Sequence, residues 1–519
     1  VYLLVVRLWA WTGILAWPPQ KVAAILALVF AVFYAGLTGF SVPAQRSALM
    51  IAIAMIAIIQ QRNTRPYLVL AVALFAVLIV DPLVVLSAGF WLSFIAVSLI
   101  IYVIAGRLGK PGLVRGGVKV NWVTSVGLAP LLLFFFQQVS VIAPLANLIA
   151  VPIISLVVVP LALLATLLML AVPIVATKIF LVVDFALQGL WWVLVKLAAL
   201  PLSTFSHTQP SWWALAFAIP GILILFAPKG MPSRSLGLIM LFPLVFTESS
   251  KILPGAMKLT LLDVGQGLSA VVQTANHTLV YDTGAKFSAT SDSGQSVVIP
   301  FLRSQGIDKV DTLIVSHGDN DHIGGAESVV GNIETGGIVT SVPQQLSAYS
   351  PTQCKAGQSW TWDKVTFSIL SPKIAKLLSD NNNSCVLQIQ ARQGSALLTG
   401  DIEAEAESWL VETYQDKLKS DVLIAPHHGS QTSSTSAFLQ AVQPNIVLIP
   451  VGYRNQFGHP HDEVVQRYKD LHIRSFNNSE DGGVTVNIEN GLKVESWRTT
   501  EGRYWNNVGS RYKAQGSSP

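Results

Sequence analysis

The first half of the chain is a series of long apolar runs separated by short polar segments. A membrane-spanning helix needs about 20 apolar residues, with a range of roughly 17–25. The longer runs are Val22–Phe40, Leu83–Ala105, Trp122–Phe136, Val139–Leu170, Pro173–Leu200 and Trp212–Phe226. Shorter runs of ambiguous length are Ala48–Ile59, Tyr67–Val80 and Leu236–Phe246. The pattern predicts a polytopic α-helical membrane domain over residues 1–250, with roughly seven to ten membrane segments.

One of these runs, Val139–Leu170, is interrupted by Pro144, Pro152 and Pro160. Proline removes a backbone donor and kinks or breaks a helix. Because the run is also unusually long, it predicts a broken or re-entrant pair of helices.

From Met257 onward, short apolar runs alternate with turn residues. The runs that predict strands are Lys258–Leu262, Ala270–Gln273, Thr278–Tyr281, Thr312–Val315, Val365–Leu370, Cys385–Gln390, Ala396–Thr399, Val422–Ile424, Ile446–Ile449 and Gly483–Ile488. Helices are predicted between some of them, at Val298–Ser304, Ala326–Val330, Ala404–Tyr414, Ser436–Ala441 and Asp462–Leu471. Residues 257–498 therefore predict one α/β domain.

The composition and charge agree with this division. Hydrophobic residues make up 52% of the 519 residues and charged residues 12%, whereas an average soluble protein has about 25% charged residues. This excludes both a purely soluble protein and a disordered one. Residues 1–250 carry 13 basic and 3 acidic side chains, and the remainder carries 21 basic and 26 acidic ones. The two halves therefore face different surroundings.

Both ends of the chain have distinct features. Val1 lies inside an apolar run, so we expect an N-terminally truncated part of a longer protein. The polar tail 499–519 combines basic and aromatic side chains, which can neutralise and stack on single-stranded nucleic acid; a disordered tail without a function is the alternative. Cys354 and Cys385 are the two cysteines, and the sequence leaves open whether they pair.

Basic residues predict the membrane topology. They gather in three loops, at Arg62 with Arg65, at Arg107 to Lys119, and at Lys229 with Arg234. Short loops rich in Lys and Arg stay cytoplasmic. If Leu236–Phe246 then crosses the membrane, the α/β domain lies on the outer side. We therefore expect a multi-pass protein of the inner, cytoplasmic membrane, with its C-terminal domain periplasmic or extracellular.

The strongest chemical signal is the segment Ser316–Gly325, which follows the predicted strand Thr312–Val315. It places four potential ligands within six residues: His317, Asp319, Asp321 and His322. Imidazole and carboxylate groups both bind divalent metals. Helix capping or an exposed polar loop does not require two histidines and two aspartates at this spacing, so the segment predicts a metal site.

Three further strand ends supply compatible side chains. Asp401 follows Ala396–Thr399, the pair His427 and His428 follows Val422–Ile424, and Asp282 follows Thr278–Tyr281. Asp401 is suited to bridge two metals, and Asp282 to support the ligands by hydrogen bonds. Taken alone, each has an ordinary alternative, such as a helix cap, an Asx turn or an exposed histidine.

The order of these motifs resembles the metallo-β-lactamase fold, an αββα sandwich. It resembles more closely the ComEC family of DNA-internalisation proteins, which joins such a domain to a competence membrane domain. The segments that carry this resemblance are Leu262–Gly267, Tyr281–Gly284, Pro300–Leu302, His317–Gly325, Asn383–Ser384, Gly400–Asp401, His427–Ser430, Gly458–Pro460, Gly89–Phe94, Phe135–Ser140 and Pro144–Pro152.

Two departures from the general fold concern the metal. Asp319 stands where the fold has a histidine, and the stretch between His322 and Asp401 contains no histidine, so Asn383 and Ser384 occupy the region of the missing ligand. Both changes favour oxygen ligands, and Mn²⁺ is therefore expected beside Zn²⁺. In part of the family an aspartate follows the Asp-x-Gly-Gln-Gly run, where this chain has Leu268.

The resemblance implies a site with two divalent ions, Zn or Mn. The expected ligands are His317, Asp319, Asp321, His322, Asp401 and His427. Asp321, His428 and His459 are expected to take part in catalysis, with His459 also a rival to His427 as the late ligand. Residues expected to support the ligands or contact substrate are Asp263, Gln266, Asp282, Asn383, Ser384 and Ser430.

The function implied is a DNA-uptake channel for natural transformation, with an external nuclease that degrades the strand that is not imported. Gln137, Gln138 and Asn147 are candidate linings of the path of the single strand, and helix packing is an equal alternative for each. A DNA receptor and a translocation ATPase are the partners that the family implies. Two other functions stay open: a membrane-anchored hydrolase of a small phosphoester, lipid or lactam, and a channel with a metal-free binding domain.

Overall fold

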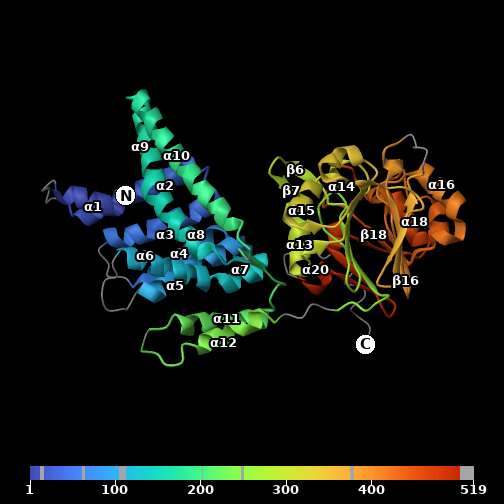
Figure 1. Cartoon of the computed structure of the whole chain (residues 1–519), viewed down its shortest axis with the longest axis horizontal. Coiled ribbons are helices and arrows are strands. Elements are labelled where there is room, and N and C mark those ends of the chain that lie inside the picture. Colours follow the sequence, from blue (N-terminus) through green and yellow to red (C-terminus); the bar gives the residue numbers. More distant parts are fainter. Residues whose placement is uncertain are drawn as a thin grey trace. The chain divides into compact units, whose positions relative to one another are not determined.

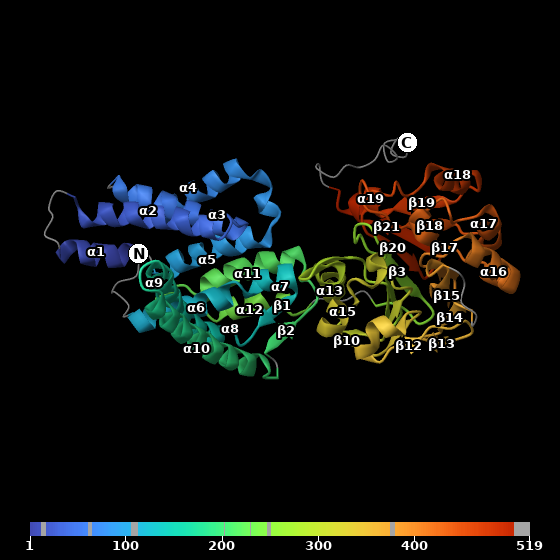
Figure 2. The same cartoon turned by 90° about the horizontal axis from the view of Figure 1, so that it is seen from above.

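A computed structural model describes residues 1–11, 17–60, 65–104, 113–201, 203–228, 230–246, 251–373 and 379–502. The chain divides into two compact units, Val1–Thr247 and Glu248–Pro519. The first is helical and the second is built around two β-sheets (Figures 1 and 2). Residues 503–519 of the predicted polar tail lie outside the described residues, as do Arg62, Arg107, Lys110 and Lys229 of the predicted basic loops.

The helices of the first unit are α1 (Tyr2–Trp11), α2 (Pro19–Leu37), α3 (Val42–Ile59), α4 (Pro66–Val80), α5 (Ala88–Ile104), α6 (Leu113–Gly127), α7 (Ala129–Phe136), α8 (Ala143–Ile153), α9 (Val159–Met169), α10 (Pro173–Ala198), α11 (Trp212–Leu225) and α12 (Leu236–Leu241). Proline occupies the first or second position of several of them, such as Pro19, Pro66 and Pro173. Proline is favoured there because its fixed φ suits the helix and its missing N–H would have no partner.

Four helical segments of the described part are long and apolar enough to cross a membrane: Pro19–Leu37, Arg115–Phe136, Ala143–Met169 and Pro173–Ala198. Shorter apolar helices are Pro43–Ile59, Pro66–Val80, Ala88–Ile104 and Trp212–Leu225. The helical membrane architecture predicted from the sequence is confirmed. The number of crossings stays a prediction.

The prediction of a broken or re-entrant pair at Val139–Leu170 is wrong. Helices α8 and α9 are joined by the π-helical turn Ile154–Val158 into one span, Ala143–Met169. Pro152 and Pro160 flank this turn. A π turn shifts the hydrogen-bond register, so the helix continues past the two prolines without a break.

The predicted crossing at Leu236–Phe246 is also shorter than expected. Helix α12 has six residues, and the 3₁₀ turn Phe242–Leu244 adds three; such a length covers roughly 14 Å, about half of the hydrocarbon core. Helix α12 packs closely on α11, as Gly237 shows: a Cβ at this position would lie 2.5 Å from the carbonyl oxygen of Gly221. This element alone does not cross a bilayer.

The second unit contains two large sheets. The first has the order β12-β11-β9-β5-β4-β3-β20-β21, with strands Thr352–Gln353, Ile338–Thr340, Thr312–Val315, Thr278–Tyr281, Ala270–Gln273, Met257–Leu261, Val484–Ile488 and Leu492–Ser496. The second has the order β13-β14-β15-β16-β17-β18-β19, with strands Ser359–Trp362, Val365–Ser371, Val386–Ala391, Gly394–Leu398, Val422–Ile424, Ile446–Ile449 and Arg474–Asn477.

Three small ribbons complete the strands: β1 (Gln138–Ser140) with β2 (Thr204–Ser206) in the first unit, and β6 (Lys286–Ser288) with β7 (Ser291–Asp292) and β8 (Lys309–Val310) with β10 (Glu334–Thr335) in the second. The helices of the second unit are α13 (Ile299–Ser304), α14 (Asn320–Ile323), α15 (Ala326–Asn332), α16 (Ala404–Tyr414), α17 (Ser436–Val442), α18 (Asp462–Asp470), α19 (Asn478–Asp481) and α20 (Trp497–Thr500).

Alternating side chains of the sheets fill three apolar layers. Leu259, Tyr281 and Leu398 belong to the layer between the two sheets. Val280 and Leu313 point the other way, into the layer that includes residues of α13 and α15. Helices α16, α17 and α18 cover the outer face of the second sheet (Figures 1 and 2). The predicted αββα architecture is confirmed.

The two cysteines are buried between the sheets and are paired. Cys354 follows β12 and Cys385 precedes β15, and their Cα atoms are 6.0 Å apart. The pairing that the sequence left open is thus present in the structure. Disulfides persist mainly in oxidising compartments.

Candidate metal centre

The potential ligands lie where strands of both sheets end. Asp282 and His317 follow the carboxyl ends of the parallel strands β5 and β9 of the first sheet. Asp401 and His428 follow the carboxyl ends of the parallel strands β16 and β17 of the second sheet. The backbone connects the two groups as well, since the N–H of Cys385 donates to the carbonyl of Ser316.

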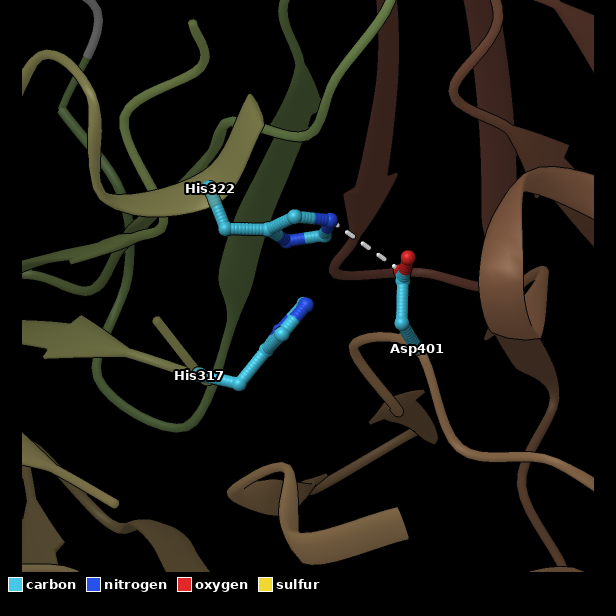
Figure 3. Close-up of side chains that lie close together, drawn as sticks. All are labelled: His317, His322 and Asp401. Carbon is cyan, nitrogen blue, oxygen red and sulfur yellow. Dashed lines mark ion pairs between the residues drawn. The ribbon is translucent and has the colours of Figure 1, made fainter. Parts of the chain in front are cut away.

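Imidazole and carboxylate atoms converge between the sheets. His322 Nε2 lies 3.2 Å from Asp401 Oδ1 and 3.3 Å from His428 Nε2. His428 Nε2 lies 3.3 Å from Asp321 Oδ2 and 3.3 Å from Asp401 Oδ2. Two overlapping sets have ligand atoms within 4.8 Å of one another and could hold a metal ion: His317 with His322 and Asp401, and Asp321 with His322 and His428. Figure 3 shows the imidazoles of the first set and the carboxylate of Asp401 directed toward one another from separate segments.

Hydrogen bonds to the far nitrogens fix two of these rings. His322 Nδ1 lies 2.8 Å from Asp282 Oδ2, and His428 Nδ1 lies 2.8 Å from the carbonyl oxygen of Pro450. A carbonyl or carboxylate oxygen accepts a hydrogen bond, so each Nδ1 carries the proton. In the neutral ring, each Nε2 then offers a lone pair to the space between the sheets.

Ser316 supports the same arrangement. Its N–H and its hydroxyl both donate to the Asp282 carboxylate, at 2.6 and 2.7 Å. Its Oγ lies 3.0 Å from His317 Nδ1. Metal-binding histidines are held in this way by carboxylates and backbone oxygens in most proteins. Asp282 thus makes the contacts expected of a residue that supports a ligand, and its role at a metal site stays a prediction.

The residues fit a divalent metal. His317 Nε2 is buried and makes no hydrogen bond with any residue of the described ranges. Two ligands of a tetrahedral ion, each about 2.0–2.1 Å from it, are about 3.3 Å apart. The Nε2 atoms of His322 and His428 have this separation. Mixed imidazole and carboxylate donors bind Zn and Mn alike.

The electrostatics of the cluster favour positive charge at this place. Burial lowers the pKa of His322, but Asp401 and Asp282 raise it well above its usual value. Burial likewise lowers the pKa of His428, and Asp401 and Asp321 raise it to about 9. Burial raises the pKa of Asp401, yet the two histidines hold it well below its usual value. Protons and a cation therefore compete for the same donors, and metal binding releases protons.

Tight turns bring the ligands together. His427 and His428 adopt the left-handed conformation, with φ of 46° and 55°, and Gly429 follows with φ of 77°. Gly400 has a φ of 57°, and a Cβ there would lie 2.9 Å from the Cβ atoms of Ser316 and Ser384. Such strained backbone is concentrated at functional sites.

The other predicted ligands lie at the rim. The side chain of Asp319 is 60% exposed, and its Oδ2 lies 3.5 Å from His317 Nε2. His427 belongs to neither metal set, and its Nε2 is 3.9 Å from Asp401 Oδ2. The structure thus places His428 in the cluster where the sequence favoured His427. The chain reverses direction at these two residues, and strand alternation cannot tell which ring points inward.

The predicted catalytic His459 lies beside the cluster. Its ring is 6.4 Å from the ring of His428 and 5.9 Å from that of His427. Burial and the charges of His428, His427 and His461 lower the pKa of His459 to about 4. Its Nδ1 is buried and makes no hydrogen bond with a residue that the structure describes.

The remaining predicted residues mainly shape loops. Asp263 accepts from the N–H of Gly265 at 3.3 Å and pairs with Arg498 at 3.4 Å. Gln266 accepts from the N–H of Gly452 at 3.3 Å. These contacts do not bring either side chain into the metal sets.

Asn383, Ser384 and Ser430 also make local contacts. Asn383 donates to the carbonyl of Ser379 at 2.7 Å, and Ser384 Oγ accepts from the N–H of Asp401 at 3.2 Å. Ser430 Oγ lies 3.1 Å from Thr432 Oγ1. Ser384 thereby contacts a residue of the metal sets directly.

Sequence reasoning missed three residues that contact the candidate site. These are Ser316 and Pro450, which contact the rings of His317 and His428, and Glu403, whose Oε1 lies 3.5 Å from His427 Nδ1. Ser316 and Pro450 directly follow strands that were predicted, so their position was a usable signal. Glu403 is two residues from Asp401, but no motif distinguishes it from an ordinary residue at the start of a helix.

Both parts of the chain resemble known proteins. Residues 1–232 match the family described as competence protein, and residues 262–453 match the metallo-beta-lactamase superfamily. Competence protein ComA of Neisseria gonorrhoeae is 35% identical over 518 residues, which cover 97% of this chain and 71% of that protein. The chain belongs to the ComEC family of competence proteins.

Other similarities agree with this family. Recombination protein 2 of Haemophilus influenzae is 31% identical, covering 92% of this chain and 64% of that protein. A solved structure of MEM-A1, a subclass B3 metallo-beta-lactamase isolated from a soil metagenome library, has 13% identity and a TM-score of 0.27, and covers 36% of this chain and 88% of that one. The match of residues 262–453 to the metallo-beta-lactamase superfamily supports a metal-dependent hydrolase, and the second unit of this chain has donors that could hold a divalent metal.

Proposed function

We propose that this membrane protein takes up DNA for natural transformation and that its second unit is a metal-dependent DNA nuclease. The observation that carries the proposal is the buried cluster of imidazole and carboxylate donors between two sheets, in a chain whose first unit matches the competence protein family. The nuclease would degrade one strand while the first unit passes the other strand across the inner membrane.

The donors divide into two sets that share His322. His317, His322 and Asp401 would hold one ion, and Asp321 and His428 would hold a second together with His322 or Asp401. Asp319 is near enough to His317 to join the first set. Two divalent ions, Zn or Mn, would activate water at neutral pH and stabilise the oxygens of a phosphoryl displacement.

The chain's own residues supply the remaining requirements. Asp282 and Pro450 keep the donor atoms of His322 and His428 turned inward. The loop of His459 is fixed by Asn455, which accepts from the N–H of His459 at 3.0 Å and donates to its carbonyl at 2.6 Å. His459, whose ring lies 6.4 Å from that of His428, would contact a phosphate oxygen.

In the first unit, two of the three proposed path residues lie where helix α7 ends. Gln137 has a φ of 56°, and its side chain donates to the carbonyl of Phe134 at 3.0 Å. Gln138 begins the ribbon β1–β2, opposite Ser206. Asn147 lies on α8 and is exposed. Polar groups of this kind replace lost hydration for a charged strand.

The proposed location of the second unit is periplasmic or extracellular, in agreement with the paired Cys354 and Cys385. A DNA receptor and a translocation ATPase would act with this protein. Labelling of intact cells by an impermeant maleimide at Ser291→Cys, an exposed position, tests the sidedness. Protection of that cysteine would place the domain in the cytoplasm.

The activity is tested on the full chain purified in detergent, with single-stranded DNA, duplex DNA, a β-lactam and bis(p-nitrophenyl) phosphate as substrates. We expect cleavage of DNA with Mn²⁺ or Zn²⁺ and none with a chelator. Hydrolysis of the small phosphoester or the lactam without DNA cleavage would favour a membrane-anchored hydrolase. Metal-independent DNA binding without any hydrolysis would favour a binding domain.

A further inference from the structure

His427 lies next to the metal cluster without belonging to it. Its side chain is 23% exposed, and its Nε2 is directed toward the cluster, 3.9 Å from Asp401 Oδ2. Its Nδ1 lies 3.3 Å from Thr432 Oγ1 and 3.5 Å from Glu403 Oε1. The ring therefore has one nitrogen on the cluster side and one nitrogen on a polar support.

The support consists of Glu403 and Thr432. The hydroxyl of Thr432 donates to Glu403 Oε1 at 2.9 Å. The carbonyl of Thr432 accepts from the N–H of Ala404 at 3.0 Å, and the N–H of Glu403 donates to Asn382 Oδ1 at 2.8 Å. Thr432 is thus fixed through its backbone to the start of helix α16, and Glu403 is fixed through its backbone to Asn382.

The side chain of Glu403 does not cap helix α16. Glu403 is the N-cap residue of α16, but its side chain makes no capping hydrogen bond. The Glu403 carboxylate instead reaches Thr432 and the ring of His427.

We propose that His427 is a catalytic residue that contacts the phosphodiester through Nε2, and that Glu403 and Thr432 are its positioning residues. This inference rests on the proposed nuclease function. Because Nδ1 lies against Thr432 and Glu403, the ring is kept from rotating away while Nε2 faces the cluster from a side chain that is partly exposed. The role differs from the metal ligation that the sequence predicted for His427, and metal content separates the two roles.

The test uses the full chain and a fluorescein-labelled single strand of DNA. We expect His427→Ala to lower kcat about a hundredfold and Glu403→Gln about tenfold, with KM changed little and bound metal equal to the unaltered protein. Thr432→Val should resemble Glu403→Gln, whereas Thr432→Ser, which keeps the hydroxyl, should retain most activity. Glu412→Gln is the matched control, because it removes an exposed carboxylate from the same helix α16.

The decisive comparison is the double variant Glu403→Gln with His427→Ala. If Glu403 acts through His427, the double variant is no slower than His427→Ala alone. If the double variant instead combines the losses of kcat of the two single variants, Glu403 acts elsewhere. If His427→Ala binds less metal than the unaltered protein, His427 is a ligand. Absence of metal-dependent cleavage in the unaltered protein would refute the proposed nuclease itself, and metal content would then still decide whether His427 is a ligand.

Discussion

Asp282 and His322 are 40 residues apart in the chain, yet Asp282 Oδ2 lies 2.8 Å from His322 Nδ1 in a fully buried contact. The contact exists because β5 and β9 are parallel neighbours, so that the segments after their carboxyl ends meet. It turns the other nitrogen of His322 toward Asp401 and His428. One carboxylate of the first sheet thereby orients an imidazole toward the second.

Replacing Asp282 by Asn should weaken metal binding. Asparagine keeps the shape but removes the negative charge that fixes the Nδ1 proton of His322. We expect the affinity for Zn²⁺ or Mn²⁺ to fall about 10- to 100-fold. Competition with a chromogenic chelator measures it, and an affinity equal to that of the unaltered protein would show that Asp282 has no part in holding the metal.

Gly267 lies in the loop that follows β3, and it packs against the segment that carries Asp321. Its φ is 139°, and a Cβ there would lie 2.5 Å from the carbonyl oxygen of Asp321. Gly267→Ala should therefore displace Asp321, weaken metal binding and destabilise the domain by about 2 kcal/mol or more. Gly265→Ala is the control, since its φ of 77° is also positive but a Cβ there would meet no atom within 4 Å. Equal metal affinity in the two variants would contradict the prediction.

The sequence predicted much of the second unit because its signals are local. Strands β4, β5, β9, β17 and β18 have the predicted bounds. The edge strands β13, β19 and β21 escaped prediction, since they carry polar or exposed residues that resemble loops. Their strand structure depends on pairing with a distant neighbour.

The sequence predicted which residues belong to the candidate site better than it predicted how they are arranged. His317, His322, Asp321 and Asp401 all lie in the metal sets, because ligand types at strand ends form a recognisable pattern. The exchange of His427 for His428 was not predictable, since it depends on consecutive residues with positive φ. In the first unit, the π turn at Ile154–Val158 was missed, because the proline positions alone also suit a break.

Asp363 should make stability depend on pH. Burial raises its pKa, but hydrogen bonds from Thr274, His277 and Asn276 lower it well below the usual value. A carboxyl group whose pKa is lower in the folded protein stabilises the fold at pH values above its pKa in the unfolded chain, which is about 4. This stabilisation is lost as the pH falls from there toward the pKa of the folded protein. Asp363→Asn should therefore lower the melting temperature at pH 7, and the difference should shrink below about pH 4. A difference that is independent of pH would contradict this origin.

The proposed path is tested separately from hydrolysis. Changing Gln137, Gln138 and Asn147 to Leu should reduce the entry of labelled DNA into cells, while cleavage by the second unit stays intact. Thr166→Val is the control, because Thr166 is an exposed helix residue whose hydroxyl bonds to Ala162 of its own helix. If duplex and single-stranded DNA enter cells with the triple variant normally, the three residues do not line the path and instead serve helix packing.

The most direct test of the account is DNA cleavage by the full chain after Asp401→Ala, measured together with metal content. Asp401 faces both His322 and His428, so its loss should reduce bound metal and lower cleavage by at least about a thousandfold. Asp416→Ala, at a side chain that is 91% exposed, is the control and should cleave normally. Cleavage near the normal rate by a folded Asp401→Ala protein would contradict a metal-dependent nuclease at this centre.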